Sequence, residues 1–352
     1  MQLSVANRTS PIAFAIFAAA VTLYGVLPTS GYGQAPSREA GGERPLVVMA
    51  TVDGAPIYQG EVDQELAVLL RNKKLAADDR ARAEAHFLNQ LIDRRLLLRY
   101  LKRRDQTISP QLVDSEIKAR TARLEQQKVS LEDRLQALGF TKQALRTDIE
   151  WRMSWKRYID RRITDDVLQQ HFDKNRRQFD GTQMRVRHIL LRGKTSADNG
   201  ADTTHVTLAQ QIRRDILEGK TTFPQAVTEH STGPSKKDGG DLGFISRQGQ
   251  MVERFAAAAF ELDKDEISPP VVTRFGVHLI QCVEIKPGTK KWADVADQLR
   301  SAVIQRGFQK IAAAERPRAK IEFTGKGAYL DPHSGELVRP DTKPSEEDRA
   351  RN

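Results

Sequence analysis

The chain is poor in cysteine. Cys282 is its single cysteine, so no internal disulfide can form and a cysteine-rich metal site is excluded. It lies in the apolar run 277–285, where a free cysteine usually behaves as a small buried hydrophobic residue. The chain also lacks a phosphate-binding loop, a Gly-x-Ser-x-Gly motif and, among its seven histidines, any His-x-x-x-His pair. These absences argue against nucleotide-dependent, serine-hydrolase and zinc-peptidase chemistry.

Aromatic residues are also few, at 6%, and none is interleaved with a basic stripe of the kind that binds nucleic acid. The 56 Lys and Arg residues exceed the 46 Asp and Glu residues, which gives a net charge of +10, but bases and acids are mixed along the chain. This mixture predicts a solvated, basic-biased surface and no nucleic-acid partner, with weak affinity for anionic lipid or acidic polypeptides as the alternative. With 352 residues, 39% of them hydrophobic, the chain is long enough for two or three domains with cores of their own.

One long apolar run is present, at the N-terminus. One arginine precedes mostly apolar residues 12–27, and small residues follow as far as Ala35. This is the order of a secretory signal peptide, predicted over 1–35. An uncleaved membrane anchor formed by 12–27 is the alternative, because Pro36 would follow the cut and the apolar core is long for a signal. A cleaved signal and an uncleaved anchor both predict an exported chain. Residues 36–45 are predicted to form a polar linker.

Residues 46–180 are predicted to be mostly helical. A short strand turns at Asp53 and Gly54, and helices follow from residue 60 to about 175. Ser130 has an acidic residue three positions later, which predicts a helix that begins there and ends at Gly139. The strongest helix covers 87–104. Its apolar positions follow helical spacing and are Leu88, Leu91, Ile92, Leu96, Leu97, Leu98 and Leu101.

The pattern changes near residue 182. Between 182 and 287 the predicted order is strand, two helices, strand, short helix, strand, strand, which indicates a compact α+β domain. Residues 288–325 form an amphipathic helix and a short strand. The proline- and charge-rich tail, 328–352, is predicted to be disordered.

Two histidines in the α+β region are candidates for chemistry. Strand alternation places His188 on the face of Val186 and His278 on the face of Ile280, so both lie on apolar faces. A single histidine in such a place is most often a satisfied core residue. Two histidines on apolar strand faces of one small domain favour a functional pair. It remains open at this point whether they are only buried core residues.

The blocks "HILL", "AVTEHS", "SKKDGGDLGFI", "GQMV" and "FGVHLI" occur in this order between 182 and 287. In order and spacing this region resembles the parvulin family of peptidyl-prolyl cis/trans isomerases. More loosely, 46–180 resembles the helical chaperone region of SurA-type and PrsA-type exported foldases, through "VDGAPI", "LNQLIDRRLLLRYLKRRD" and "ITDDVLQQHFDKN". The resemblance implies a four-stranded antiparallel sheet with surrounding helices, joined to a mostly helical domain on which 288–325 packs.

The resemblance also implies site residues and a reaction. The apolar proline pocket would be formed by Leu242, Met251, Phe255 and Phe275. His188 and His278 would form a hydrogen-bonded pair, supported by the hydroxyl of Thr273, that orients the substrate and tunes polarity without transferring protons. No cofactor or metal is implied. The implied partners are unfolded or partly folded polypeptides with Xaa–Pro bonds, and the implied location is the periplasm or cell envelope.

The chain departs from the family at Gly233, where relatives usually carry Cys or Asp near the reacting imide. Glycine offers no side-chain dipole, so catalysis is predicted to be weak, or to draw on Ser231, Ser235 or Asp241. The leading hypothesis is an exported isomerase and chaperone. The alternative is a non-catalytic holdase whose parvulin module only binds proline-containing segments.

Overall fold

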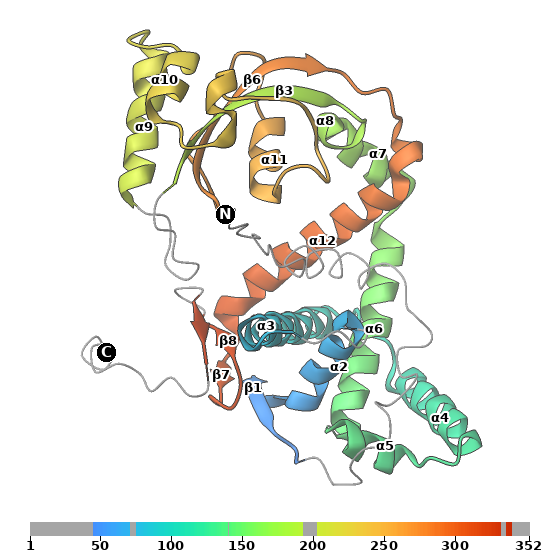
Figure 1. The fold of residues 1–352 in the computed structure, drawn as a ribbon. Coiled ribbons are helices and arrows are strands. Elements are labelled where there is room, and N and C mark those ends of the chain that lie inside the picture. The colour runs from blue at the N-terminus through green and yellow to red at the C-terminus, as the bar shows by residue number, and fades with distance from the viewer. Residues whose placement is uncertain (1–44, 71–74, 140, 193–202, 332–335, 340–352) are drawn as a thin grey trace. The chain divides into compact units, whose positions relative to one another are not determined.

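The computed structural model describes residues 45–70, 75–139, 141–192, 203–331 and 336–339. The predicted signal or anchor segment therefore lies outside the described residues, as does nearly all of the linker. The described residues divide into two compact units, one formed by those within 1–164 and 300–352 and the other by those within 165–299 (Figure 1). Within the described ranges, no helix is both long enough and apolar enough to cross a membrane.

The first unit is mostly helical. Its helices are α2 (Gln59–Leu70), α3 (Ala77–Lys102), α4 (Pro110–Gln126), α5 (Leu131–Leu138), α6 (Lys142–Arg162), the part of α12 (Ala296–Glu315) from residue 300 onward, and the short η3 (Arg316–Arg318). Its strands are β1 (Val48–Val52), β2 (Ala55–Tyr58), β7 (Ile321–Phe323), β8 (Tyr329–Leu330) and β9 (Leu337–Val338).

Several boundaries in this unit follow from local sequence signals. Ser130 accepts a hydrogen bond from the Asp133 amide at the start of α5, and Gly139 ends that helix with a φ of 73°. Both features were predicted. The predicted turn between β1 and β2 is formed by Asp53 and Gly54, whose φ angles are 50° and 80°.

The chain returns from the second unit to complete a sheet in the first. The strand order is β2-β1-β7, and Ala50 of β1 lies opposite Phe323 of β7 in an antiparallel pair. After β7 in the sequence, β8 pairs with β9. The ring of Tyr329 in β8 stacks on the ring of Phe323 in β7, with centroids 4.2 Å apart. The tail therefore differs from the predicted disorder over 328–352, because β8 and β9 in its first part pair as antiparallel strands. Residues 332–335 and 340–352 lie outside the described residues.

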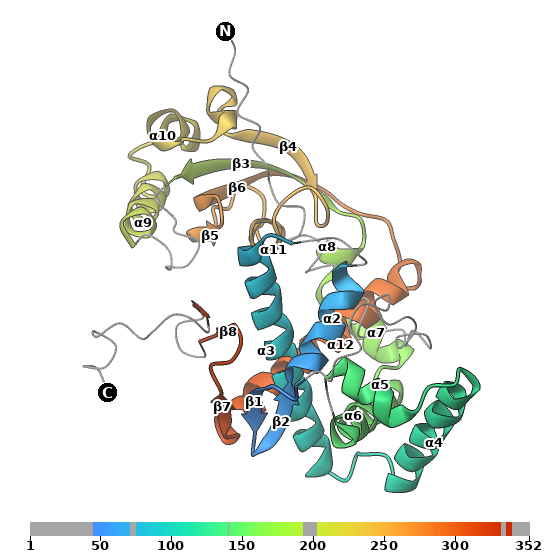
Figure 2. The same cartoon turned by 60° about the horizontal axis from the view of Figure 1, so that its bottom comes forward.

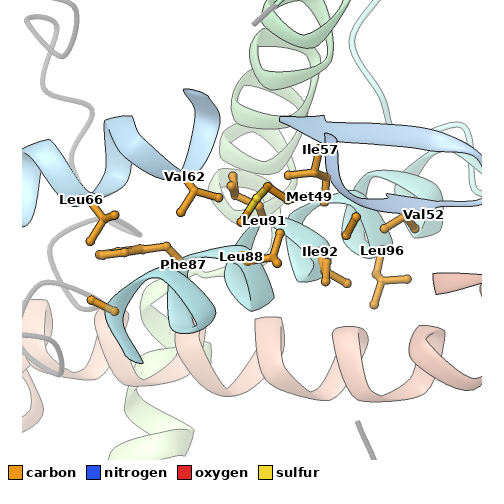
Figure 3. Packing of buried hydrophobic residues seen from close by; sticks show 12 residues of the cluster. Met49, Val52, Ile57, Val62, Leu66, Phe87, Leu88, Leu91, Ile92 and Leu96 are labelled. Carbon is orange, nitrogen blue, oxygen red and sulfur yellow. The ribbon is translucent and has the colours of Figure 1, made fainter. Parts of the chain in front are cut away.

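The core of the first unit lies between α2, α3 and the β1–β2 hairpin (Figure 3). The apolar positions predicted for the strongest helix are all buried in α3, and several of them meet strand residues in this core. Figure 3 labels Met49 and Val52 of β1, Ile57 of β2, Val62 and Leu66 of α2, and Phe87, Leu88, Leu91, Ile92 and Leu96 of α3.

Two buried ion pairs connect α2 to α3 beside this core. Arg94 pairs with Glu65, and Arg95 pairs with Glu61, with all four side chains nearly inaccessible to solvent. The Arg94 guanidinium also lies over the ring of Trp151, 5.3 Å from its centroid. Because a buried charge that loses its partner is strongly unfavourable, these pairs fix how α2 packs on α3.

The second unit combines one sheet with helices on both faces. Its strands are β3 (Gln183–Leu191), β4 (Asp241–Ser246), β5 (Val271–Thr273) and β6 (Gly276–Lys286). Its helices are α7 (Asp165–Lys174), α8 (Arg176–Phe179), α9 (Thr203–Leu217), α10 (Phe223–His230), η1 (Pro234–Asp238), α11 (Glu253–Phe260) and η2 (Trp292–Val295). The strand order is β4-β3-β6-β5 and every neighbouring pair is antiparallel (Figure 2). The predicted fold class and element order are confirmed.

The start of this unit differs from the sequence prediction, which assigned residues through 180 to the helical region. Residues 165–180 belong to the second unit. Arg177 donates to the carbonyl oxygen of Leu262 and to Asp263, and the carbonyl of Asp180 accepts from the Lys290 amide. These polar contacts tie α8 and its C-cap to segments that lie far along the sequence.

The two sheet faces bury different sets of residues. One face packs Ile189, Leu191, Val277 and Leu279 against α9 and α10. The other packs Val186, Ile280 and Cys282 against α11. The predicted burial of the single cysteine is confirmed. Because side chains alternate along a strand, the histidines next to these residues, at 188 and 278, lie on the face covered by α11.

The buried ion pairs of the first unit give a stability prediction. Glu61→Ala leaves Arg95 buried without its carboxylate and removes the acceptor of the Tyr58 amide, so we expect a loss of about 3–5 kcal/mol in the free energy of unfolding. Urea titration followed by tryptophan fluorescence measures it.

The matched control is Glu84→Ala. Glu84 pairs with Arg80, which is half exposed, along one face of α3, and its removal should cost less than about 1 kcal/mol. Equal losses in the two variants would contradict the assigned role of the buried pairs.

Candidate functional site

Antiparallel pairing of β3 with β6 brings the two histidines together. His188 lies opposite Ile280, and His278 lies opposite Leu190, so the two rings are diagonal neighbours on one face of the sheet. Their centroids are 5.5 Å apart and their planes differ by 22°. The Nδ1 atoms of the two rings are 3.3 Å apart, within hydrogen-bond distance.

A hydroxyl bonds to the outer nitrogen of each ring. The Thr273 Oγ1 atom is 2.8 Å from Nε2 of His278, and the Ser235 Oγ atom is 3.0 Å from Nε2 of His188. We call these four residues the histidine chain: Ser235, His188, His278 and Thr273. Each ring nitrogen in it has one polar partner, so both imidazoles are fully hydrogen-bonded.

Burial keeps both rings uncharged near neutral pH. His188 is 6% exposed and His278 is 4% exposed. Loss of hydration lowers the pKa of His188 to about 4. The pKa of His278 is also lowered to about 4, first by burial and then by repulsion from a charged His188. The pair therefore works as neutral donors and acceptors at pH 7.

The predicted apolar residues differ in their access to solvent. Phe255, in α11, is 2% exposed and directs its ring edge-to-face at both histidines, with centroids 5.9 Å and 5.3 Å away. Leu242 and Met251 are half-buried and pack against the core cluster that contains Phe255. Phe275 is 46% exposed, and its amide donates to Thr273 Oγ1 over 3.1 Å. The accessible apolar surface thus comes mainly from Leu242, Met251 and Phe275.

The loop at Gly233 passes directly over His188. Gly233 is the N-cap residue of η1, and a Cβ atom there would lie 3.3 Å from His188 Nε2 and 3.4 Å from Leu190 Cβ. A side chain at this position would therefore stand beside the histidine pair. In this chain the position adds no polar side chain.

Of the three polar residues considered for this role, one reaches a histidine. Ser231 Oγ accepts from the amides of Leu190 and Gly233, and so holds the loop. Asp241 forms an ion pair with Arg185 at the surface. Ser235 alone of the three contacts an imidazole. Sequence pattern could not single it out, because a 3₁₀ turn in a loop has no periodicity that predicts where its side chains point.

A glycine fixes the approach of this loop to β3. Gly240 has a φ of 82°; its amide donates to the carbonyl of Ser235, and its carbonyl accepts from the His188 amide, both over 2.9 Å. A Cβ atom at 240 would lie 2.5 Å from the His188 carbonyl oxygen. The backbone contact that aligns Ser235 with His188 therefore requires glycine.

No group of three or more His, Cys, Asp or Glu side chains within the described part of the chain is arranged to hold a metal ion. The arrangement at the histidine chain is instead two neutral imidazoles with two hydroxyls beside apolar side chains. Such a set can orient a polar backbone group and offer an apolar surface to a ring.

Comparison with known families gives two matches. Residues 188–284 match the PPIC-type PPIase domain, and residues 3–159 match the SurA-like N-terminal domain. The first match spans β3 to β6 and therefore contains the whole histidine chain.

Foldases and chaperones are among the relatives with known names. The foldase protein PrsA of Bacillus subtilis is 29% identical over 166 residues, 47% of this chain and 55% of that protein. Chaperone SurA of Chromohalobacter salexigens is 36% identical over 152 residues, 43% of this chain and 32% of that protein. The chain thus spans about half, or less, of the length of these relatives. The crystal structure of PrsA from Bacillus anthracis is similar at 21% identity and a TM-score of 0.34, covering 66% of this chain and 96% of that one.

The lowered histidine pKa values predict how stability depends on pH. An unfolded histidine titrates near pH 6.5, whereas each folded ring has a pKa of about 4. Between these values the unfolded state binds more protons, so acidification should lower the free energy of unfolding by up to about 1.4 kcal/mol per pH unit for each histidine. Urea unfolding of the full chain at stepped pH from 7 to 4 measures this slope.

The comparison variant for this measurement is His188→Gln, which removes one of the two titrating rings. Its slope between pH 6.5 and 4 should be shallower than that of the unchanged chain. Equal slopes, or ring C2 proton resonances that titrate near pH 6.5, would show that the rings are not held neutral by burial.

The contact at Gly240 gives a further stability prediction. Gly240→Ala places a methyl group against the His188 carbonyl, whereas Gly243→Ala has open space at a similar φ of 67°. We expect the first to cost roughly 2 kcal/mol more than the second, the range of an overpacked core substitution. Thermal unfolding of the two variants measures the difference. Matched losses would mean that backbone conformation alone, and not the close approach, requires glycine at 240.

Proposed function

We infer that this chain, which combines a PPIC-type PPIase domain with a SurA-like N-terminal domain, is a peptidyl-prolyl cis/trans isomerase and chaperone. Its substrates would be Xaa–Pro bonds in unfolded or partly folded polypeptides. The observation that carries the proposal is the histidine chain, buried and neutral, beside half-buried Leu242 and Met251.

The reaction needs no nucleophile. Rotation about an Xaa–Pro bond has a barrier of about 18–20 kcal/mol, because amide resonance gives the C–N bond partial double-bond character. Water stabilises the charge-separated form that carries this resonance. An imide placed against apolar side chains loses that stabilisation, and contacts that fit the twisted geometry then favour the transition state over both planar isomers.

Each group in the site has a distinct part in this mechanism. The pyrrolidine ring, which is apolar and has no N–H, packs on Leu242 and Met251. Phe255 is too buried to offer the substrate much contact area. Its ring packs edge-to-face against both imidazoles and so supports their position. The neutral imidazoles place a fixed, uncharged polar surface beneath the imide and transfer no proton.

We also propose that the chain acts outside the cytoplasm, in the periplasm or cell envelope. Support comes from the apolar segment 12–27 and from the SurA-like match, which begins at residue 3. Mass measurement of the protein recovered from the envelope fraction tests the proposal. A mass short of 1–35 indicates a cleaved signal, the full mass in membranes indicates an anchor, and recovery only from cytoplasm contradicts export.

A second function is favoured by one observation. Gly233 leaves the position above His188 without a side chain, and a holdase that binds proline-containing segments without turning them over would not need one. Under this alternative the chain suppresses client aggregation with negligible isomerase activity, and the suppression survives Met251→Ala.

The isomerase proposal predicts the outcome of a protease-coupled proline-peptide assay on the full chain. The unchanged chain should accelerate isomerisation above the buffer rate. Met251→Ala and His278→Ala should each lower kcat/KM about tenfold or more, equivalent to about 1.4 kcal/mol of lost transition-state stabilisation.

The control for this assay is Leu217→Ala, at an exposed position of α9; its rate should match that of the unchanged chain. A buffer-level rate for the unchanged chain, with no effect of either site substitution, would remove the enzymatic part of the proposal and leave the holdase.

A further inference from the structure

We propose that Ser235 is a positioning residue that sets which nitrogen of each imidazole carries the proton. This inference deepens the proposed function and rests on it for its consequence for rate. Its structural basis is the contact between the Ser235 hydroxyl and Nε2 of His188.

Ser235 is aligned with His188 through both its side chain and its backbone. It is 8% exposed, and its Oγ atom lies 3.0 Å from His188 Nε2. Its carbonyl accepts from the Gly240 amide, and the Gly240 carbonyl accepts from the His188 amide. Two backbone hydrogen bonds through Gly240 and the side-chain contact together form a ring of interactions between Ser235 and His188. This ring fixes the position of the hydroxyl at the imidazole.

Counting protons in the histidine chain distinguishes two arrangements. In the first, Ser235 donates to Nε2 of His188, Nδ1–H of His188 donates to Nδ1 of His278, and Nε2–H of His278 donates to Thr273 Oγ1. The Thr273 hydroxyl then donates to the Gly276 carbonyl, 3.5 Å away. Every donor in this arrangement has an acceptor.

The second arrangement reverses every donor. Thr273 would donate to His278, His278 to His188, and Nε2–H of His188 to Ser235. The Ser235 hydroxyl proton would then need another acceptor, and within the described residues its Oγ atom has no hydrogen-bond partner apart from His188. Because buried donors are rarely left unpaired, the first arrangement is favoured.

Because residue 233 is glycine, no side chain at that position competes with Ser235 for Nε2 of His188. A Cβ atom at 233 would lie 3.3 Å from the same Nε2 atom, so a polar side chain there would compete for it. Without one, Ser235 is the side-chain partner that remains for His188 Nε2 among the described residues. The neutral state of both rings, which their lowered pKa values support, is required for a directional chain of this kind.

The experiment is ¹⁵N NMR of the imidazoles in the full chain at pH 7, with histidine labelled. The expected pattern is a proton on Nδ1 of His188 and on Nε2 of His278. Ser235→Ala should change this pattern to mixed or reversed tautomers and lower kcat/KM about 3- to 10-fold, the range for loss of one positioning hydrogen bond.

The matched control is Ser231→Ala, a buried serine in the same loop that contacts the Leu190 and Gly233 amides but no imidazole. It should leave the tautomers unchanged, because the bond between the Gly240 amide and the Ser235 carbonyl holds Ser235 in place without Ser231. The opposite tautomers in the unchanged chain, or an unaltered ¹⁵N pattern in Ser235→Ala, would overturn the inference. The tautomer result does not depend on turnover, so an inactive chain with the expected pattern would count against the proposed function and not against Ser235.

Discussion

The candidate site depends on keeping two imidazoles uncharged inside a sheet. A buried imidazole is stable only when each ring nitrogen has a polar partner, since an unpaired buried donor or acceptor costs about 1–3 kcal/mol. His188 and His278 meet this requirement through each other and through one hydroxyl each. The loop that carries Ser235 and the strand β5 that carries Thr273 are therefore as necessary to the site as the strands that carry the rings.

Close backbone contacts hold the loop of Ser235 and the turn after Thr273 in place. At Gly240 the loop meets the backbone of β3, and at Gly276 the β5–β6 turn passes so close to Leu191 that a Cβ atom would lie 2.3 Å from its carbonyl oxygen. Both glycines have positive φ, of 82° and 133°. Gly240 lies in the block "SKKDGGDLGFI" and Gly276 in the block "FGVHLI". At both positions the chain approaches a strand more closely than any side chain permits, which explains why glycine is needed there.

Much of the fold could be predicted from the sequence because its signals are local. Strand alternation placed both histidines on the apolar face, and the helix-capping signals at Ser130 and Gly139 marked the ends of α5. What could not be predicted depends on contacts between distant segments. The division at residue 164 depends on the contacts that α8 makes with Leu262 and Asp263, and the pairing of β8 with β9 depends on stacking against Phe323. The contact of Ser235 depends on how a 3₁₀ turn meets β3.

The proposed function requires that the histidine pair acts in its neutral form. The decisive measurement is the pH dependence of kcat/KM for a proline peptide, from pH 4 to 8, on the full chain. Because burial lowers both pKa values to about 4, we expect a constant rate from pH 8 to about 6 and a decline only towards pH 4. A rate that changes with an apparent pKa near 6.5 would mean that a ring gains or loses its charge during function, and that the neutral pair is not the active form.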